Sequence, residues 1–237
     1  MLTLATILEA TRGHLEGAHA AIDFTAVVID SRRVVPGCLF VCLRGPSHDG
    51  HAYAETAVRD GAVGVVAAAD WHGKLPMVPV VRVPDTQAAL GAIARAHRRQ
   101  LGLKVVAVTG SSGKTSTKEM IAAYLGARWP VAKTIGNENN EIGVPLTLLR
   151  LSGEHRAAVV EMGMRGLGEI AYLAGLAEPD VGVITNIGVA HLERLGSVEG
   201  IARAKTELWR DGPEGQIAVF PLDDPHLKAA VGTRGHV

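Results

Sequence analysis

The stretch of sequence that decides the fold runs Val105-Val106-Ala107-Val108-Thr109-Gly110-Ser111-Ser112-Gly113-Lys114-Thr115. Its apolar first half predicts a buried strand, and the glycine-rich turn that follows leads into a predicted helix over residues 114–125. Backbone N–H groups in such a turn, together with the N-terminus of the helix, bind phosphate oxygens. The stretch therefore predicts a phosphate-binding loop between a strand and a helix.

Each residue type in this loop has a physical role in binding a nucleotide. Gly110 and Gly113 allow the backbone to approach the phosphate oxygens closely. Lys114 can neutralise charge on the terminal phosphates, and Thr115 can place its hydroxyl on Mg²⁺. The pattern is shorter than the full G-x-x-x-x-G-K-[ST], because Val108 stands where the first glycine would be. The loop predicts ATP as a ligand and leaves kinase, ATPase and ligase open.

Strands and helices alternate on both sides of the loop, which predicts an α/β protein with a mainly parallel sheet. After the loop, helices are expected over 140–149, 167–176 and 198–210, and strands over 157–160, 181–184 and 216–220. Before it, helices are expected over 4–11, 51–60 and 86–101, and strands over 24–29, 38–43, 62–67, 78–83 and 104–108. We predict a small N-terminal α/β domain over 1–84 and a P-loop domain over 85–237 whose sheet is incomplete.

Composition excludes several classes of protein. Lys and Arg number 24 and Asp and Glu number 24 in 237 residues, and this neutral balance argues against a nucleic-acid binder. Cys38 and Cys42 lie in one apolar run, so buried thiols are expected rather than a disulfide framework. The sequence has no signal-peptide pattern and no apolar run long enough to cross a bilayer, so a cytoplasmic protein without membrane insertion is predicted.

A second group of candidate residues follows the later strands. Glu161 ends the predicted strand 157–160, and the carboxyl ends of parallel strands lie beside the ligand in open α/β sheets. Glu161 could therefore hold Mg²⁺ together with Thr115, or it could be an ordinary solvated residue at a strand end. His191 follows the next strand, and Lys205, taken singly, is typical of a solvated helix lysine. The ligand spacing does not suit zinc.

Together these segments resemble the Mur ligase family of bacterial cell-wall synthesis. The segments that carry the resemblance are 30–40, 49–51, 109–115, 136–149, 161–163, 184–192 and 201–207. Segment 136–149, Gly-Asn-Glu-Asn-Asn-Glu-Ile-Gly-Val-Pro-Leu-Thr-Leu-Leu, looks like the branch of the family that adds D-alanyl-D-alanine. These motifs occur in the order that the family has them.

The resemblance implies a ligase that joins D-alanyl-D-alanine to UDP-N-acetylmuramoyl-tripeptide with cleavage of ATP to ADP and phosphate. ATP would first phosphorylate the substrate carboxylate, and the dipeptide amine would then attack the acyl phosphate. The resemblance also implies a cytoplasmic enzyme of peptidoglycan precursor synthesis, linked to cell shape and division, and usually monomeric.

The resemblance further implies roles for individual residues. Lys114, His191 and Lys205 would be catalytic, and the nucleotide would contact the loop residues Gly110, Ser111, Ser112, Gly113, Lys114 and Thr115 together with Asn186. Thr115 and Glu161 would hold the first Mg²⁺ and His191 the second, supported by Lys205 after its carbamylation by CO₂. The residues implied to meet the UDP-sugar substrate are Ser31, Arg32, Asp49, Gly50, His51, Asn139 and Asn140.

The sequence also departs from the family. Members carry a third, C-terminal domain, which is not expected within these 237 residues, and Phe220-Pro221-Leu222 stands where an Asn usually precedes the Asp pair. Three hypotheses therefore remain. The chain is the D-alanyl-D-alanine-adding ligase or an N-terminal portion of it, or a related ligase such as one that extends a folate glutamate chain, or a non-catalytic nucleotide-binding remnant.

Overall fold

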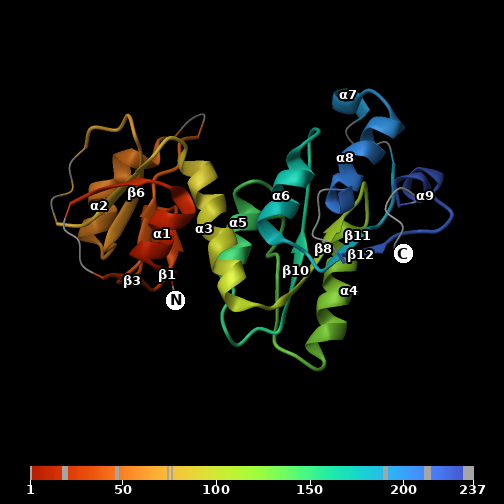
Figure 1. Ribbon diagram of the computed structural model, residues 1–237, viewed down its shortest axis with the longest axis horizontal. Helices are drawn as coiled ribbons and strands as arrows, with labels where there is room; N and C mark the ends of the chain where they lie inside the picture. The colour runs from red at the N-terminus through yellow and green to blue at the C-terminus, as the bar shows by residue number, and fades with distance from the viewer. Residues whose placement is uncertain are drawn as a thin grey trace. The chain divides into compact units, whose positions relative to one another are not determined.

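The computed structural model describes residues 2–17, 21–45, 48–73, 75, 77–188, 192–210 and 215–231. The chain forms two compact units, Met1–Gln100 and Leu101–Val237 (Figure 1). From the sequence, the division was expected after residue 84. In the structure, helix α3 (Thr86–Leu101) groups with the first unit except for its last residue. One contact that holds it there is the hydrogen bond from Gln100 Nε2 to Thr6 Oγ1, 3.3 Å long.

The first unit contains a five-stranded sheet in which every neighbouring pair is parallel except β2 with β7. Its strand order is β2 (His14–Glu16), β7 (Val80–Val83), β6 (Gly64–Ala68), β5 (Leu39–Val41), β4 (Val27–Val28). A separate antiparallel pair joins β1 (Leu2–Thr3) and β3 (Asp23–Phe24). The helices are α1 (Leu4–Thr11), α2 (Ala54–Arg59) and α3, with short 3-10 turns η1 (Ser31–Arg33) and η2 (Gly50–Tyr53).

Two expectations for this unit need correction. The single strand predicted over 24–29 is two strands in different sheets, because the chain leaves β3 and joins β5 through β4. The helix predicted over 51–60 begins as the 3-10 turn η2, because the carboxylate of Asp49 accepts the N–H of His51 at 3.0 Å and sets a tight first turn.

The second unit contains a five-stranded sheet in which all neighbours are parallel. Its order is β12 (Ile217–Val219), β11 (Val181–Ile184), β8 (Lys104–Thr109), β10 (Ala157–Glu161), β9 (Val131–Lys133). The helices are α4 (Lys114–Gly126), α5 (Gly143–Leu149), α6 (Glu169–Ala177), α7 (Leu192–Leu195), α8 (Val198–Arg210) and α9 (Pro225–Val231). The strand that carries the glycine-rich loop is therefore central in the sheet.

Successive side chains of each strand point to opposite faces of this sheet, and helices pack against both faces. Val108, Val159 and Val183 form one apolar cluster with Ala122 of α4. Gly182 points to the opposite face, where an added Cβ would lie 2.7 Å from the Trp209 ring of α8. This close approach explains why a glycine interrupts an otherwise apolar strand. The sheet is thus covered on both sides, as expected for parallel strands.

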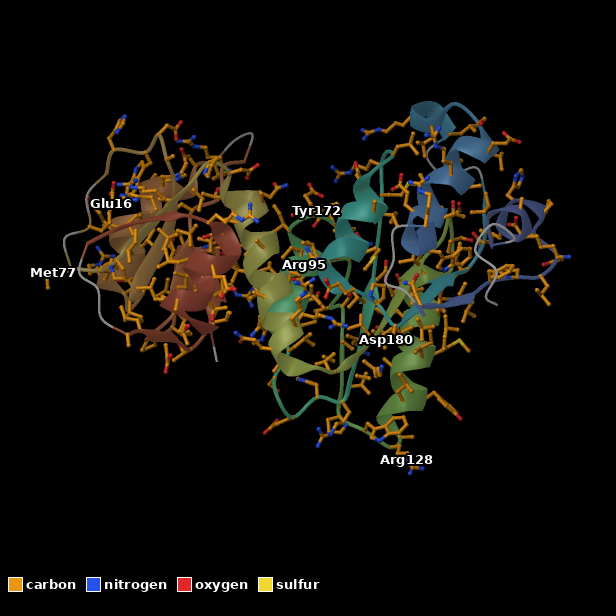
Figure 2. All side chains as sticks on the ribbon, viewed as in Figure 1. Glu16, Met77, Arg95, Arg128, Tyr172 and Asp180 are labelled. Atoms are coloured by element: carbon orange, nitrogen blue, oxygen red, sulfur yellow. The ribbon has the colours of Figure 1, made fainter. Side chains whose placement is uncertain are left out.

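The register of the central strands aligns their carboxyl ends at one edge. Glu161 pairs with Val108, and Ile184 pairs with Thr109. At the opposite edge, Asp180 (labelled in Figure 2) accepts the N–H of Val105 at 2.9 Å, which fixes the start of β8 against β11. The loops after β8, β10 and β11 consequently emerge side by side. None of the helices in the described part of the chain is long and apolar enough to cross a bilayer.

Candidate nucleotide, metal and sugar-nucleotide sites

The glycine-rich loop after β8 has the backbone conformation that its two glycines were expected to supply. Gly110 has φ 151° and Gly113 has φ 75°, both in the region that favours glycine. A Cβ at position 110 would also lie 1.8 Å from Thr185 Oγ1, so no larger residue fits there. Gly113 directly precedes α4, so the loop ends at a helix N-terminus. This is the geometry that binds phosphate.

The segment after β11 packs against this loop. The N–H groups of Ser111 and Ser112 donate to the backbone oxygen and to Oδ1 of Asn186, each at 3.1 Å. Thr185 Oγ1 donates to the carbonyl of Ser112 at 2.6 Å, and the N–H of Gly188 donates to Ser111 Oγ at 2.9 Å. Asn186 therefore lies beside the phosphate loop and accepts hydrogen bonds from two of its backbone donors, while its contact with a nucleotide remains a prediction.

Lys114 begins α4, and its ammonium folds back over the loop. Its Nζ donates to the carbonyl oxygen of Gly110 at 2.9 Å. This contact keeps a cation at the glycine-rich loop, where it can attract phosphate oxygens. The structure thus brings the glycines, the lysine and the helix N-terminus together as the sequence predicted.

Glu161 lies at the end of β10 and is only 2% exposed, so the alternative of a solvated strand-end residue is wrong. Its Oε2 accepts a hydrogen bond from Thr115 Oγ1 at 3.0 Å, and its Oε1 accepts one from Asn139 Nδ2 at 2.8 Å. Lys118 Nζ lies 3.8 Å from the same Oε2. The two residues proposed for the first Mg²⁺ are therefore adjacent.

The donor set suits a hard cation. Mg²⁺ prefers oxygen ligands and is commonly held by one or two carboxylates plus substrate phosphates. Thr115 and Glu161 supply a hydroxyl and a carboxylate at the mouth of the phosphate loop. Within the described residues, no group of three or more His, Cys, Asp or Glu side chains could hold a metal without such help. The residues present fit a cation that arrives with a nucleotide.

Lys205 lies on α8 and is 2% exposed, so the solvated-lysine interpretation is wrong. Burial, followed by the positive charge of Lys114, lowers its pKa from 10.5 to about 8. His191, predicted for the same region, lies outside the described residues, so its role stays a prediction.

The two asparagines expected to meet the substrate have other contacts here. The amide of Asn139 holds Glu161, and its backbone oxygen accepts the N–H of Gly163 at 2.7 Å. Asn140 Oδ1 accepts the N–H groups of Ile142 and Gly143 at 3.3 and 2.9 Å. These hydrogen bonds hold a turn over residues 140–142, and α5 begins after it at Gly143 and not at residue 140, where the sequence placed its start. Substrate contacts of Asn139 and Asn140 remain a prediction.

Two buried charged residues near the site were not among the site residues predicted from the sequence. Lys118 is buried on α4, one turn after Lys114, and a helical lysine gives no sequence signal of burial. Glu207 is 2% exposed, and its carboxylate accepts the N–H groups of Gly168 and Ala171, which caps α6. The positive φ of Gly168 and this cap set the start of α6 at Glu169, later than predicted.

The first unit has a cavity of about 420 Å³ at the end of its parallel strands. Its lining includes three of the residues predicted to meet a sugar nucleotide, Ser31, Arg32 and Gly50. The full lining is Ile29, Asp30, Ser31, Arg32, Phe40, Leu43, Gly45, His48, Gly50 and Tyr53. This set combines an apolar wall with polar and cationic groups, as small-molecule sites do.

Asp30 fixes the position of Arg32 at the cavity. Its Oδ1 accepts hydrogen bonds from the Arg32 backbone N–H and from Nε, and its Oδ2 accepts from Nη2 at 2.7 Å. Hydrogen bonding to Arg32 lowers the pKa of Asp30 to about 2 and raises the pKa of the arginine. The Arg32 side chain is 87% exposed, so its remaining donors are open to a ligand.

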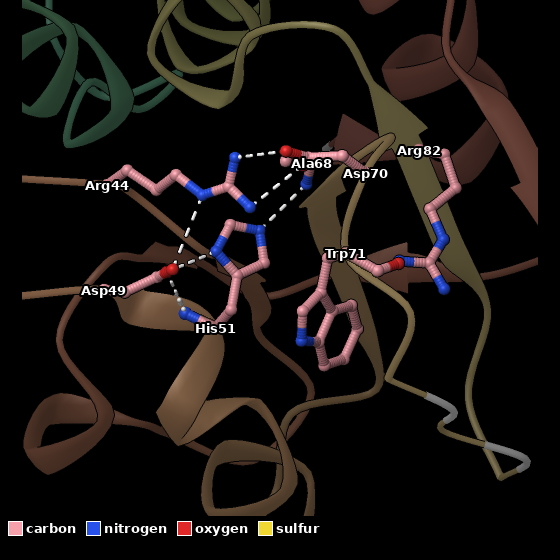
Figure 3. A network of polar contacts seen from close by, with 7 residues as sticks. All are labelled: Arg44, Asp49, His51, Ala68, Asp70, Trp71 and Arg82. Carbon is pink, nitrogen blue, oxygen red and sulfur yellow. Dashed lines mark hydrogen bonds and ion pairs between the residues drawn. The ribbon is translucent and has the colours of Figure 1, made fainter.

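Asp49 and His51 are not among the residues that line the cavity. They belong to a network of polar contacts with Arg44 and Ala68 (Figure 3). The carboxylate of Asp49 contacts His51 Nδ1, while His51 Nε2 accepts the N–H of Ala68 at 2.9 Å. The imidazole packs against Trp71 with ring centroids 5.5 Å apart, and Arg44 joins Asp49 to Asp70. Both ring nitrogens are thus used to hold the turn that carries Gly50. A direct substrate contact of Asp49 or His51 remains a prediction.

Comparison with known proteins matches both units to one family. The family profile described as "Mur ligase middle domain" matches residues 108–236. The profile described as "Mur ligase family, catalytic domain" matches residues 23–98. These ranges contain the phosphate loop with Glu161 and Lys205, and the cavity with Arg32, respectively.

The individual proteins that are similar to this chain share one name. The chain is 42% identical over 236 residues to the UDP-N-acetylmuramoyl-tripeptide–D-alanyl-D-alanine ligase of Escherichia coli strain K12, covering 98% of this chain and 51% of that protein. A crystal structure of MurF from Acinetobacter baumannii matches with TM-score 0.88 and 35% identity, over 98% of this chain and 51% of that one.

A third match holds a nucleotide. The crystal structure of MurF ligase from Thermotoga maritima in complex with ADP has TM-score 0.81 and 36% identity, over 88% of this chain and 48% of that one. This chain therefore spans about half the length of the relatives it matches.

Proposed function

Because this chain belongs to the Mur ligase family, we propose that it carries the nucleotide and sugar-nucleotide sites of an ATP-dependent ligase that adds D-alanyl-D-alanine to UDP-N-acetylmuramoyl-tripeptide. The names of the relatives support this substrate pair. The observation that carries the proposal is the Thr115–Glu161 contact beside the phosphate loop. The reaction belongs to peptidoglycan precursor synthesis, and we place it in the cytoplasm.

A carboxylate does not react with an amine until it carries a leaving group. In the proposed first step, a carboxylate oxygen of the tripeptide attacks the γ-phosphorus of ATP, and the bond to the β-γ bridging oxygen breaks to release ADP. Negative charge spreads over the transferred phosphoryl group, and Lys114 and the N-terminus of α4 stabilise it. In the second step, the dipeptide amine attacks the acyl carbon, loses a proton and expels phosphate.

Thr115 and Glu161 would hold Mg²⁺ through the hydroxyl and carboxylate oxygens that now contact each other. When bound, the ion neutralises charge on the β- and γ-phosphates. Asn139 orients the second oxygen of Glu161, so this carboxylate is positioned from both sides.

Lys205 is suited to the carbamylation that the resemblance implies. With a pKa of about 8, a large fraction of its amine is neutral near pH 8. The ammonium first loses one proton; the neutral amine then attacks the carbon of CO₂, a C–N bond forms as one C=O π bond becomes the carbamate C–O⁻, and a second proton leaves the nitrogen, so that a cation becomes an anion. Such a carbamate would offset the positive charge of Lys114 and supply a further oxygen ligand.

The cavity of the first unit is proposed to bind the UDP part of the substrate. Arg32 offers fixed donors to the diphosphate, and Ser31 adds a hydroxyl on the same turn. Tyr53 and Phe40 supply aromatic surface in the cavity wall. Asp49 and His51 contribute by holding Gly50 in place.

Product formation tests the proposal. The chain is mixed with UDP-N-acetylmuramoyl-tripeptide, D-alanyl-D-alanine, ATP and Mg²⁺, and products are followed by mass spectrometry and phosphate release. We expect one phosphate for each pentapeptide formed, and neither product with Lys114→Ala. Nucleotide binding without any pentapeptide would favour a non-catalytic remnant, and product with a different acceptor would favour a related ligase.

A further inference from the structure

Lys118 is a buried lysine that the proposed mechanism does not use. It lies on α4, one turn after Lys114, with its side chain 1% exposed. Its Nζ donates to the carbonyl oxygen of Thr134 at 3.0 Å and lies 3.2 Å from Glu119 Oε1. Lysines are almost never fully buried unless they are paired, so this position has a specific partner.

The buried partner of Lys118 is Glu161. Nζ lies 3.8 Å from Oε2, the same oxygen that accepts the Thr115 hydroxyl, and both side chains are buried. Glu119, the other partner, is 46% exposed, so water screens that pair more strongly. Lys118 therefore faces two carboxylates, the half-exposed one of Glu119 and the buried one of Glu161 that is proposed to hold the metal.

A cation in this position has two opposing effects on a metal at Glu161. It compensates the buried carboxylate, which would otherwise lack a counter-charge in a site of low dielectric. It also repels any second cation that approaches the same oxygen, and this repulsion is strong where water is excluded. A free divalent ion therefore binds less tightly at Glu161 than it would bind beside an unpaired carboxylate. A nucleotide diphosphate or triphosphate brings several negative charges, which outweigh one lysine.

We propose that Lys118 is a positioning residue that serves as the resident counter-cation of Glu161: it holds the carboxylate toward Thr115 and weakens its binding of a free divalent cation, so that the first metal binds together with the nucleotide phosphates. This inference rests on the proposed function only in taking Glu161 as a ligand of the nucleotide's metal.

The test measures Mn²⁺ binding without nucleotide, by calorimetry and by electron paramagnetic resonance. Lys118→Met keeps an unbranched side chain without charge, and Lys118→Gln also keeps a donor for the Thr134 carbonyl. We expect both variants to bind Mn²⁺ at least about tenfold more tightly than the wild type. Adding Glu161→Gln to either variant should remove the gain.

Lys133→Met is the matched control. Lys133 also pairs with Glu119 but has no contact with Glu161 among the described residues, so its loss should leave Mn²⁺ affinity unchanged. A structural role alone would lower the melting temperature of the Lys118 variants without any gain in metal affinity. Equal or weaker Mn²⁺ binding in the cooperatively folded Lys118 variants overturns the proposal.

The wild type supplies a second measurement that does not depend on the variants' folding. We expect ADP to increase its Mn²⁺ affinity at least about tenfold, because the phosphates offset Lys118. Mn²⁺ binding that is equally tight with and without ADP also overturns the proposal. Neither outcome depends on pentapeptide formation, so failure here leaves the proposed function open, and failure of the product assay leaves this inference open.

Discussion

Replacing Lys205 with methionine should stabilise the second unit. Lys205 is 2% exposed, and burial together with the charge of Lys114 lowers its pKa from 10.5 to about 8. At about 1.4 kcal/mol per pKa unit, folding disfavours the ammonium by about 3 kcal/mol relative to the unfolded chain. Methionine is unbranched, of similar length and uncharged. Lys205→Met should therefore raise the free energy of unfolding by up to about 3 kcal/mol at pH 7.

The lowered pKa of Lys205 also predicts how the stability of the wild type changes with pH. The folded pKa lies below the unfolded value, so between pH 8 and 10.5 the unfolded chain binds more protons than the folded chain. Wild-type stability therefore rises with pH across this window, while the variant lacks this rise. The difference in free energy of unfolding between Lys205→Met and the wild type should be constant below pH 8 and should vanish above pH 10.5.

Urea unfolding in CO₂-free buffer measures this difference from pH 7 to 10.5. Trp209 lies one turn beyond Lys205, and Trp71→Phe in both chains removes the tryptophan of the first unit from the fluorescence signal. Lys228→Met, at an exposed position, should change stability by less than about 0.5 kcal/mol. A Lys205→Met chain that is less stable than the wild type at pH 7, or a difference that stays constant up to pH 10.5, would refute the reasoning.

The remaining predictions concern ligands and turnover. Arg32→Ala should weaken binding of UDP-N-acetylmuramoyl-tripeptide roughly tenfold or more in calorimetry, because a charged hydrogen bond is lost; unchanged affinity would remove the cavity assignment. Lys114→Ala should abolish phosphate release while circular dichroism stays unchanged, since Lys114 contacts the loop and not a core; wild-type release would contradict the loop's role. Lys205→Ala should lose turnover and regain part of it with added formate or acetate, and rescue by chloride alone would argue against a carbamate.

The sequence predicted the elements with strong local signals. The bounds of α1, α3, α8 and β11 agree with the predicted ranges, because these segments combine clear periodicity with capping or glycine signals. β9 was missed because an edge strand of three residues carries too little pattern. The segment predicted as one strand over 24–29 forms two strands in different sheets, because its two halves pair with different partners elsewhere in the chain.

The candidate site was predictable where a residue follows a strand, and not where its role depends on packing. Glu161 and the loop lie at the carboxyl ends of parallel strands, so topology alone brings them together. The burial of Lys118 and the contact of Asn139 with Glu161 depend on how α4 and the segment after β9 pack against β10. His51 shows the same limit, because its ring binds Ala68, seventeen residues away.

The most direct test of the proposed ligase is the fate of a carboxylate oxygen. UDP-N-acetylmuramoyl-tripeptide labelled with ¹⁸O in the reacting carboxylate is incubated with the chain, D-alanyl-D-alanine, ATP and Mg²⁺, and the released phosphate is analysed by mass spectrometry. An acyl phosphate transfers one labelled oxygen to each phosphate as the amide forms, so we predict one ¹⁸O in each phosphate released alongside pentapeptide. Phosphate without the label, or released without pentapeptide, would contradict the account.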